Sequence, residues 1–303
     1  MHTAAFPYIL LLGVLWGTTL VMSRFGVGQF DPVLFVALRL TIASLAFGLV
    51  YAVSRRRQVS RQRYLWRHAA LLGVVGTAVP MTAIVSSLQF QSSGVTSLLV
   101  TTSPAFIVVA AHLFLPDEQL NLTKGMGVVL ALGGAALLIL RGETGLPNVT
   151  EANPLGYALV ILGILAETTG AIYIRKKMQG LDAFDVTAVR LLAATVVTLP
   201  VALLWRGFDV AQVNGAGLLS LAYAALAGAF AAQLMAFYIT RRFGATAFSL
   251  TSYVIPVVAA VAGVFVLGET ITIWMLGGMV LIVFGIMLIN RRQADQKIMK
   301  QGV

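Results

Sequence analysis

The sequence predicts an all-α polytopic membrane protein with ten transmembrane helices, arranged as two inverted repeats of five. Three observations lead to this fold class. Of the 303 residues, 59% are hydrophobic and only 11% are charged, whereas a soluble domain carries about 25% charged residues. Ten apolar stretches are each long enough to cross a bilayer, and several motifs recur at a nearly constant offset. Soluble enzyme, nucleic-acid binder and disordered protein are therefore poor interpretations, despite a net charge of +10.

A spanning helix needs about 20 mainly apolar residues. The connections between the apolar stretches are short and polar, so we expect no separate soluble domain. No small-residue cleavage site follows the first stretch, so we expect no removable signal peptide. The ten predicted spans are Phe6–Gly26, Pro32–Val53, Ala69–Phe90, Gly94–Leu115, Leu122–Leu140, Pro154–Ile174, Ala183–Trp205, Gly215–Tyr238, Ala245–Leu267 and Ile271–Asn290.

The distribution of basic residues predicts the orientation. If the N-terminus is cytoplasmic, most of the 21 Lys and Arg residues fall on the cytoplasmic side, including six arginines between residues 55 and 67 and four basic residues after residue 290. Only Arg24, Arg141 and Arg206 fall on the opposite side. Because cytoplasmic loops are enriched in Lys and Arg, we expect both termini in the cytoplasm.

The chain repeats itself. Residues 30–40, with Asp31 and Arg39, match residues 181–191, with Asp182 and Arg190, at an offset of 151. Matches at an offset of 152 join Pro104, Gly125 and Gly133 to Pro256, Gly277 and Gly285. We therefore predict two five-helix repeats, residues 1–150 and 151–303. Because five is odd, the second repeat enters the membrane from the other side, an architecture typical of secondary transporters with a site at the midplane.

Three charged residues fall well inside predicted spans, away from the span ends, where charge needs a partner or a wet cavity. Arg39 and Arg190 lie early in the second and seventh spans. They either snorkel and cap carbonyl groups or act as a gate or anion contact, and the first interpretation is favoured. Glu167 lies deep in the sixth span. It is either a hydrogen-bonded structural acid or a cavity residue for proton coupling or amine binding, with the second slightly favoured.

Uncharged residues complete the candidate site. Trp16 lies ten residues into the first span, away from either interface, so we interpret it as a pocket residue that can stack on a substrate. Pro104 and Pro256 remove backbone donors and predict matching breaks, which serve either as gates or as static kinks. The other candidate binding residues are Thr82, Ser86, Gln89, Thr101, Ser103, Gln233, Tyr238, Ser252 and Tyr253.

The groups needed for catalysis do not converge. The histidines, His2, His68 and His112, are too scattered for a metal site, and the chain has no His-Glu-x-x-His motif. It also has no cysteine and no Gly-Lys-Ser/Thr loop for a nucleotide phosphate. We therefore expect no enzyme activity, no metal and no cofactor, and any energy for transport must come from a gradient.

Ten spans in a five-plus-five repeat, Trp16-Gly17 in the first span, Arg39, Pro104 and Leu267-Gly268-Glu269 together resemble the EamA family of the drug/metabolite transporter superfamily. The likeness covers essentially the whole chain, although in the first half the last motif departs to Leu115-Pro116-Asp117-Glu118. The resemblance implies a basket in which spans 1, 3, 4, 6, 8 and 9 surround a central cavity and spans 5 and 10 pack outside. It also implies export of small metabolites across the bacterial inner membrane.

Within that family the chain looks most like the YddG-type exporters of aromatic and other amino acids. The expected function is thus export of amino acids by alternating access, in a monomer or homodimer whose partners are a small-molecule substrate and the lipid bilayer. A drug or polyamine exporter is the alternative, in which Glu167 neutralises a cation. A lipid flippase is a weaker one, and an intramembrane enzyme is disfavoured.

Overall fold

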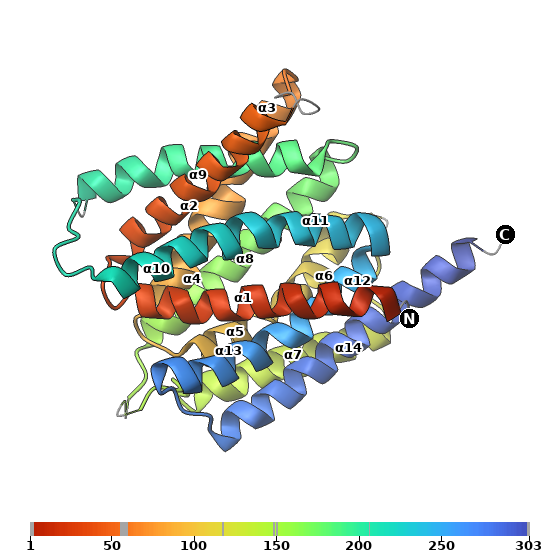
Figure 1. Cartoon of the computed structure of the whole chain (residues 1–303). Helices are drawn as coiled ribbons and strands as arrows, with labels where there is room; N and C mark the ends of the chain where they lie inside the picture. Colours follow the sequence, from red (N-terminus) through yellow and green to blue (C-terminus); the bar gives the residue numbers. More distant parts are fainter. Residues whose placement is uncertain are drawn as a thin grey trace.

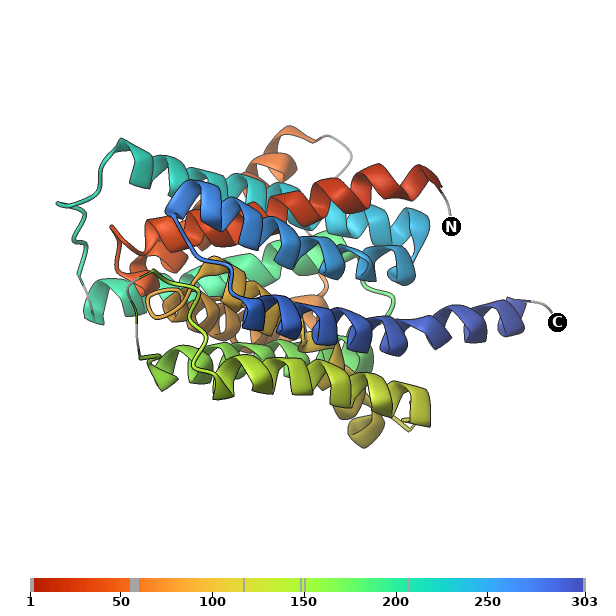
Figure 2. The same cartoon turned by 90° about the horizontal axis from the view of Figure 1, so that it is seen from below.

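A computed structural model describes residues 3–54, 60–116, 118–147, 149, 151–205 and 207–301, and none of these residues lies in a strand. Ten helical runs in this part of the chain are long and apolar enough to cross a membrane. The helices lie side by side in one bundle, with both chain ends at the same end of it (Figures 1 and 2). Arg55, Arg56, Arg57 and Arg206, residue 150 and the side chains of residues 291–301 lie outside the described part. The orientation of the chain in the membrane stays a prediction.

Seventeen helical segments form the bundle. A short 3-10 turn precedes the first span, and the third and eighth spans each contain a π-helical segment. In chain order they are η1 (Thr3–Ala5), α1 (Phe6–Gly26), α2 (Pro32–Val53), α3 (Arg63–Gly73), η2 (Val74–Ala78), α4 (Val79–Ser87), α5 (Ser93–Val100), α6 (Ser103–Phe114), α7 (Leu122–Leu140), α8 (Pro154–Lys177), α9 (Ala183–Trp205), α10 (Gly215–Tyr223), η3 (Ala224–Ala231), α11 (Ala232–Phe243), α12 (Ala245–Ser249), α13 (Thr251–Leu267) and α14 (Ile273–Gln301).

The expected all-helical fold with ten spans is confirmed. The first, second, fifth and seventh spans have the predicted bounds. The third begins earlier, at Arg63, and the eighth continues to Phe243, because helix at both places extends into polar sequence beyond the hydrocarbon. Capping residues mark the starts of two of these helices: the carboxylate oxygen Oδ1 of Asp31 accepts from the amides of Val33 and Leu34, and Asp182 does the same for α9.

The packing of α7 on α14 is reciprocal. A Cβ atom on Gly127 would lie 2.5 Å from the carbonyl oxygen of Gly285, and one on Gly134 would lie 2.8 Å from that of Gly278. Gly127 and Gly278 are 151 residues apart, as are Gly134 and Gly285, so each contact is the repeat image of the other. The helices run antiparallel, since the later glycine of one meets the earlier glycine of the other. The sequence match had joined Gly125 and Gly133 to the second half, but both face open space.

The packing of α2 on α9 gives the same relation. The hydroxyl groups of Ser44 and Thr195 lie 3.0 Å apart, and these two residues are themselves separated by 151 positions. A residue that meets its own repeat image lies at the pseudo-twofold axis. Both lie near the middle of their helices, so the axis passes through the centre of the spans. This geometry is that of an inverted five-plus-five repeat.

Breaks in the helices lie partly where proline predicts. In the fourth span, Thr101 and Thr102 form a turn between α5 and α6, and Pro104 lies in the first turn of α6. In the ninth span the interruption lies at Leu250, while Pro256 is inside the continuous α13. The prediction of a matching break at Pro256 is therefore wrong. A helix passes through a proline when the carbonyl left without its donor is accommodated locally.

The glycine contacts of α7 and α14 generate a stability prediction. The change Gly285→Ala places a methyl group 2.5 Å from the amide of Ala131 and the carbonyl of Gly127, so we expect a loss of about 1–3 kcal/mol from overpacking. Gly133→Ala has nothing within 4 Å and is the matched control. Thermal unfolding of both variants in detergent measures the difference, and equal midpoints would contradict the packing described above.

Candidate functional site

Glu167 lies near the middle of α8 and is half-buried. Its Oε2 atom lies 3.1 Å from the hydroxyl of Ser103, the first residue of α6 after the break in the fourth span. The same hydroxyl lies 2.7 Å from the carbonyl oxygen of Val100. An acid at membrane depth needs a polar partner, and the interruption of the fourth span supplies one.

The backbone around Glu167 is closely packed. Gly163 and Gly170 share one face of α8 with Glu167, because the three residues are spaced by four and three positions. A Cβ atom on Gly163 would reach the side chain of Ile84 at 2.6 Å, and one on Gly170 would lie 3.2 Å from the Cα of Gly76. The face that carries the acid therefore rests on α4 and on the π-helical segment η2. Such segments occur frequently at functional sites.

Arg190, on α9, is the positive charge that acts on Glu167. The two side chains interact electrostatically. The Nε atom of Arg190 is buried and has no hydrogen-bond partner among the described residues, so part of the guanidinium is available to another acceptor. Acid, hydroxyl and guanidinium thus come from the sixth, fourth and seventh spans.

Arg39, the repeat image of Arg190, has a different environment. It is 7% exposed, and its Nη1 donates to the hydroxyl of Ser23 over 3.3 Å. That hydroxyl in turn lies 2.7 Å from the carbonyl oxygen of Thr19. The contacts hold α2 against α1, as expected of an arginine that caps polar groups inside the bundle.

Trp16 occupies the position in α1 that Glu167 occupies in α8, 151 residues later. It is half-buried, and its ring meets the ring of Phe248 edge to face at 5.9 Å. Both rings pack on a buried cluster of four residues, Leu12, Ala232, Ala236 and Ile239. The same place in the two repeats therefore holds an indole in one half and a carboxylate in the other.

The other predicted residues divide into two groups. Thr82, Ser86, Gln233 and Ser252 are half-buried on α4, α11 and α13, and no structural observation contradicts a role for them. The remaining four are placed away from Glu167 and Ser103 or are engaged elsewhere, namely Gln89, Thr101, Tyr238 and Tyr253.

Each residue of the second group has a clear location. Gln89 is exposed after the end of α4. Thr101 is buried, and its hydroxyl donates 2.7 Å to the carbonyl of Ser97, one turn back. Tyr238 is 40% exposed and its ring lies 5.2 Å from that of Tyr8. The hydroxyl of Tyr253 accepts from Asn290 on α14 over 3.0 Å, so this ring belongs to the contact with the outer helix.

Two polar contacts were not predicted. The hydroxyl groups of Thr18 and Tyr223 lie 2.7 Å apart and join α1 to α10. Glu269, used above only as part of a motif, is 5% exposed and accepts hydrogen bonds from Ser93. The glycine before it provided a signal, because Gly268 has a φ of 67°, a backbone conformation that favours glycine and turns the chain after α13.

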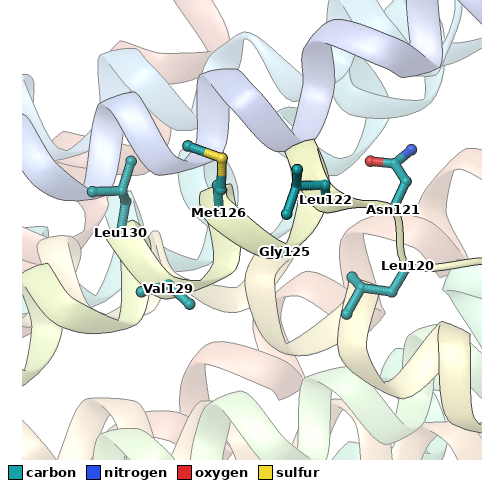
Figure 3. Close-up of a pocket in the computed structure, with 7 residues that line it drawn as sticks. All are labelled: Leu120, Asn121, Leu122, Gly125, Met126, Val129 and Leu130. Atoms are coloured by element: carbon teal, nitrogen blue, oxygen red, sulfur yellow. The ribbon is translucent and has the colours of Figure 1, made fainter.

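Two open hollows are lined by described residues. One, of about 540 Å³, lies along the outer face of α7 and is almost wholly apolar; Met126 and Val129 lie on its wall (Figure 3). The other, of about 570 Å³, lies between α1, α10, η3 and the end of α13 and includes Tyr223. None of the predicted binding residues lines either hollow.

The sequence model of one family, described as the EamA-like transporter family, matches this chain twice, over residues 3–140 and 154–291. The chain belongs to the EamA-like transporter family. The motif resemblance is thereby confirmed at the level of the family, which makes the chain a membrane transporter with ten spans. The two matches begin 151 residues apart, the offset of the reciprocal glycine contacts.

Curated relatives of this EamA-like transporter include other transporters. The chain is 26% identical over 280 residues to the uncharacterized transporter YoaV of Bacillus subtilis, covering 92% of this chain and 94% of the relative. It is 27% identical over 288 residues to the uncharacterized inner membrane transporter YedA of Escherichia coli K12, covering 94% and 90%. A crystal structure with 21% identity superposes with a TM-score of 0.68 over 97% of this chain and 99% of the other, which supports the fold.

Glu118 of this EamA-like transporter lies in the connection between α6 and α7. Glu118 Oε1 accepts from Arg175 Nη1 at 2.7 Å, and Oε2 accepts from Lys124 Nζ at 3.4 Å. Partial burial acts to raise the pKa of this carboxyl. The hydrogen bond from Arg175 and the charges of Lys124 and Arg175 outweigh it, so the pKa lies below the ordinary value of 4.5.

The lowered pKa of Glu118 generates a pH prediction. A carboxyl whose pKa is lower in the folded state stabilises that state above its ordinary pKa, and the contribution is lost as the pH falls through the folded value. We expect Glu118→Gln to remove part of the acid sensitivity of thermal unfolding between about pH 5 and pH 3, by less than ~1 kcal/mol because the group is partly exposed. The same pH dependence in both proteins would contradict this.

Proposed function

We propose that this transporter exports small metabolites of the amino-acid type, aromatic ones included, by alternating access between its two repeats. The observation that carries the proposal is the half-buried Glu167, which meets Ser103 at the interruption of the fourth span. An ionisable residue inside a span is a functional-site hypothesis by default, and transporters with inverted repeats bind at interrupted helices near the midplane.

The candidate residues together suit a zwitterion with an apolar side chain. The carboxylate of Glu167 is a partner for an ammonium group or a carrier for a proton, while the buried Nε of Arg190 is a donor for a carboxylate. Half-buried Thr82, Ser86, Gln233 and Ser252 supply uncharged donors and acceptors. Trp16, with Phe248 beside it, supplies an aromatic surface for the rest of the substrate.

The likeness to YddG-type exporters supports the same substrate class, and the names of the relatives YoaV and YedA state only transport. We further propose that the chain lies in the bacterial inner membrane, as the name of YedA states for that relative. Both termini lie at one end of the bundle (Figure 2), and the positive-inside rule supports a cytoplasmic location for that end.

The second candidate is an exporter of cationic drugs or polyamines, favoured by the carboxylate of Glu167 alone. Arg190 opposes it, since a guanidinium that interacts with Glu167 repels a second cation in the same site. Competition of labelled amino acids with cationic dyes separates the two candidates.

The change Glu167→Gln tests the proposal in proteoliposomes that carry a pH gradient. The unmodified protein should take up at least one member of a panel of labelled amino acids. The variant should lose the pH-driven part about tenfold or more, because a hydrogen bond to a charged group contributes ~1.5–3 kcal/mol.

Glu143→Gln is the matched control. Glu143 is also buried, but it accepts from Thr272 at the end of the bundle, so transport should persist. No uptake of any amino acid, with uptake of cationic dyes, would favour the second candidate. Unchanged pH coupling in Glu167→Gln would contradict the role of Glu167.

A further inference from the structure

Glu118 and Glu269 are repeat images of each other. They are 151 residues apart, and each follows the interrupted span of its own half, the fourth and the ninth. Glu118 lies shortly before α7 and Glu269 shortly before α14. Because these two helices are antiparallel, their first turns lie at opposite ends of the bundle (Figure 2). The two glutamates, which shortly precede these turns, therefore lie at opposite ends as well.

At its end, Glu269 joins the two halves through the start of α5. Its Oε1 accepts from the amide of Ser93 at 2.8 Å, and its Oε2 accepts from the hydroxyl of Ser93 at 2.7 Å and from the amide of Gly94 at 3.4 Å. The side chain is 5% exposed. Gly263 on α13 has no Cβ, and this leaves room for the carboxylate, which a Cβ atom there would strike.

Glu118, at the other end, is bound by cations instead. Arg175 and Lys124 occupy its two oxygen atoms, and the side chain is 25% exposed. The repeat image of Arg175 is Arg24, and Arg24 interacts electrostatically with Glu269. Each end therefore has one arginine and one glutamate, at equivalent positions of the two repeats. At one end, Glu269 hydrogen-bonds to the start of α5, a helix of the other half. At the other end, Glu118 is bound by Arg175 and Lys124 and makes no such contact with a helix start in the described part of the chain.

We propose that Glu269 and Glu118 are two latches that close the opposite ends of the transport path in alternation, with Glu269 closed and Glu118 open in this structure. In the other state Glu269 leaves Ser93 for Arg24. Glu118 then leaves Arg175 and Lys124 for the start of the ninth span, near Gly244, which is the repeat position of Ser93. The inference rests on the alternating access of the proposed function and not on its substrate.

The two proposed states use similar interactions of the two carboxylates. Each state contains one carboxylate buried on backbone donors and one carboxylate bound by cations, and the Ser93 hydroxyl adds a donor in the present state only, because Gly244 has none. Charge-assisted hydrogen bonds of both types are strong, so neither state gains a large excess of them. Two states that differ by a few kcal/mol are both populated, as a transport cycle requires.

The test uses the absence of cysteine from the chain, which makes a single introduced thiol the only target of a membrane-impermeant maleimide. Ser86→Cys, near the end of α4, reports on the Glu269 end, and Ser252→Cys, at the start of α13, reports on the Glu118 end. Each reporter is labelled from the side of its own end in oriented vesicles, without substrate.

With Glu269→Gln we expect labelling of Ser86→Cys to rise about tenfold and that of Ser252→Cys to fall, because a hydrogen-bonded charge is removed from the closed latch. With Glu118→Gln we expect labelling of Ser86→Cys to fall and that of Ser252→Cys to rise, since the state in which Glu118 is the closed latch is then destabilised. Opposite shifts distinguish latches from residues that merely stabilise the fold, whose loss would raise both rates. Ser93→Ala, which keeps the carboxylate, should shift the rates as Glu269→Gln does, but less.

Glu143→Gln is the control at the Glu269 end, where its partner is Thr272, and it should leave both rates unchanged. Reporters that respond in the unmodified protein but do not shift with Glu269→Gln, Ser93→Ala and Glu118→Gln would overturn the latch inference alone. Reporters that are never labelled from either side in any variant would overturn alternating access itself, and with it both proposals.

Discussion

The close approach of α7 and α14 at their glycines is the contact on which the rest of the structure depends. Lipid is as apolar as leucine, so helices in a bilayer gain little from hiding apolar surface and associate through close packing. Gly127 against Gly285 and Gly134 against Gly278 bring the backbones together in a reciprocal, antiparallel way. That relation orients one half against the other, and Ser44 and Thr195 meet at the resulting axis.

Hydropathy predicted the spans well because it is a local property. Asp31 and Asp182 mark helix starts through their own side chains, and the bilayer limits the length of the helices. The irregular segments depend on packing instead. The π-helical segments η2 and η3 contain Gly76 and Gly228, which face Gly170 and Thr19 on the neighbouring spans. No property of either segment alone signals this, and the interruption at Leu250 likewise has no proline near it.

Within the candidate site, the sequence predicted best those residues whose charge is energetically costly at membrane depth. Glu167 and Arg190 are rare types at membrane depth, and the structure places them within interaction range. Tyr238 and Tyr253 were less predictable, because spans that are apolar on all sides do not indicate which face a residue occupies. The repeat offset also contained information that composition did not, since it pairs Trp16 with Glu167 and Arg24 with Arg175.

Differences between the two repeats make the two ends of the bundle chemically unequal. If both ends were chemically identical, the states open at either end would be equally populated. Lys124 breaks this equality: it adds a second cation to Glu118, whereas its repeat position holds Met275, which is 1% exposed and packs in the core. Under the latch proposal, Lys124 favours the state in which Glu118 is held open, and this is the state that the structure adopts. The indole of Trp16, at the repeat position of the Glu167 carboxylate, makes the interior of the two halves chemically different in the same way.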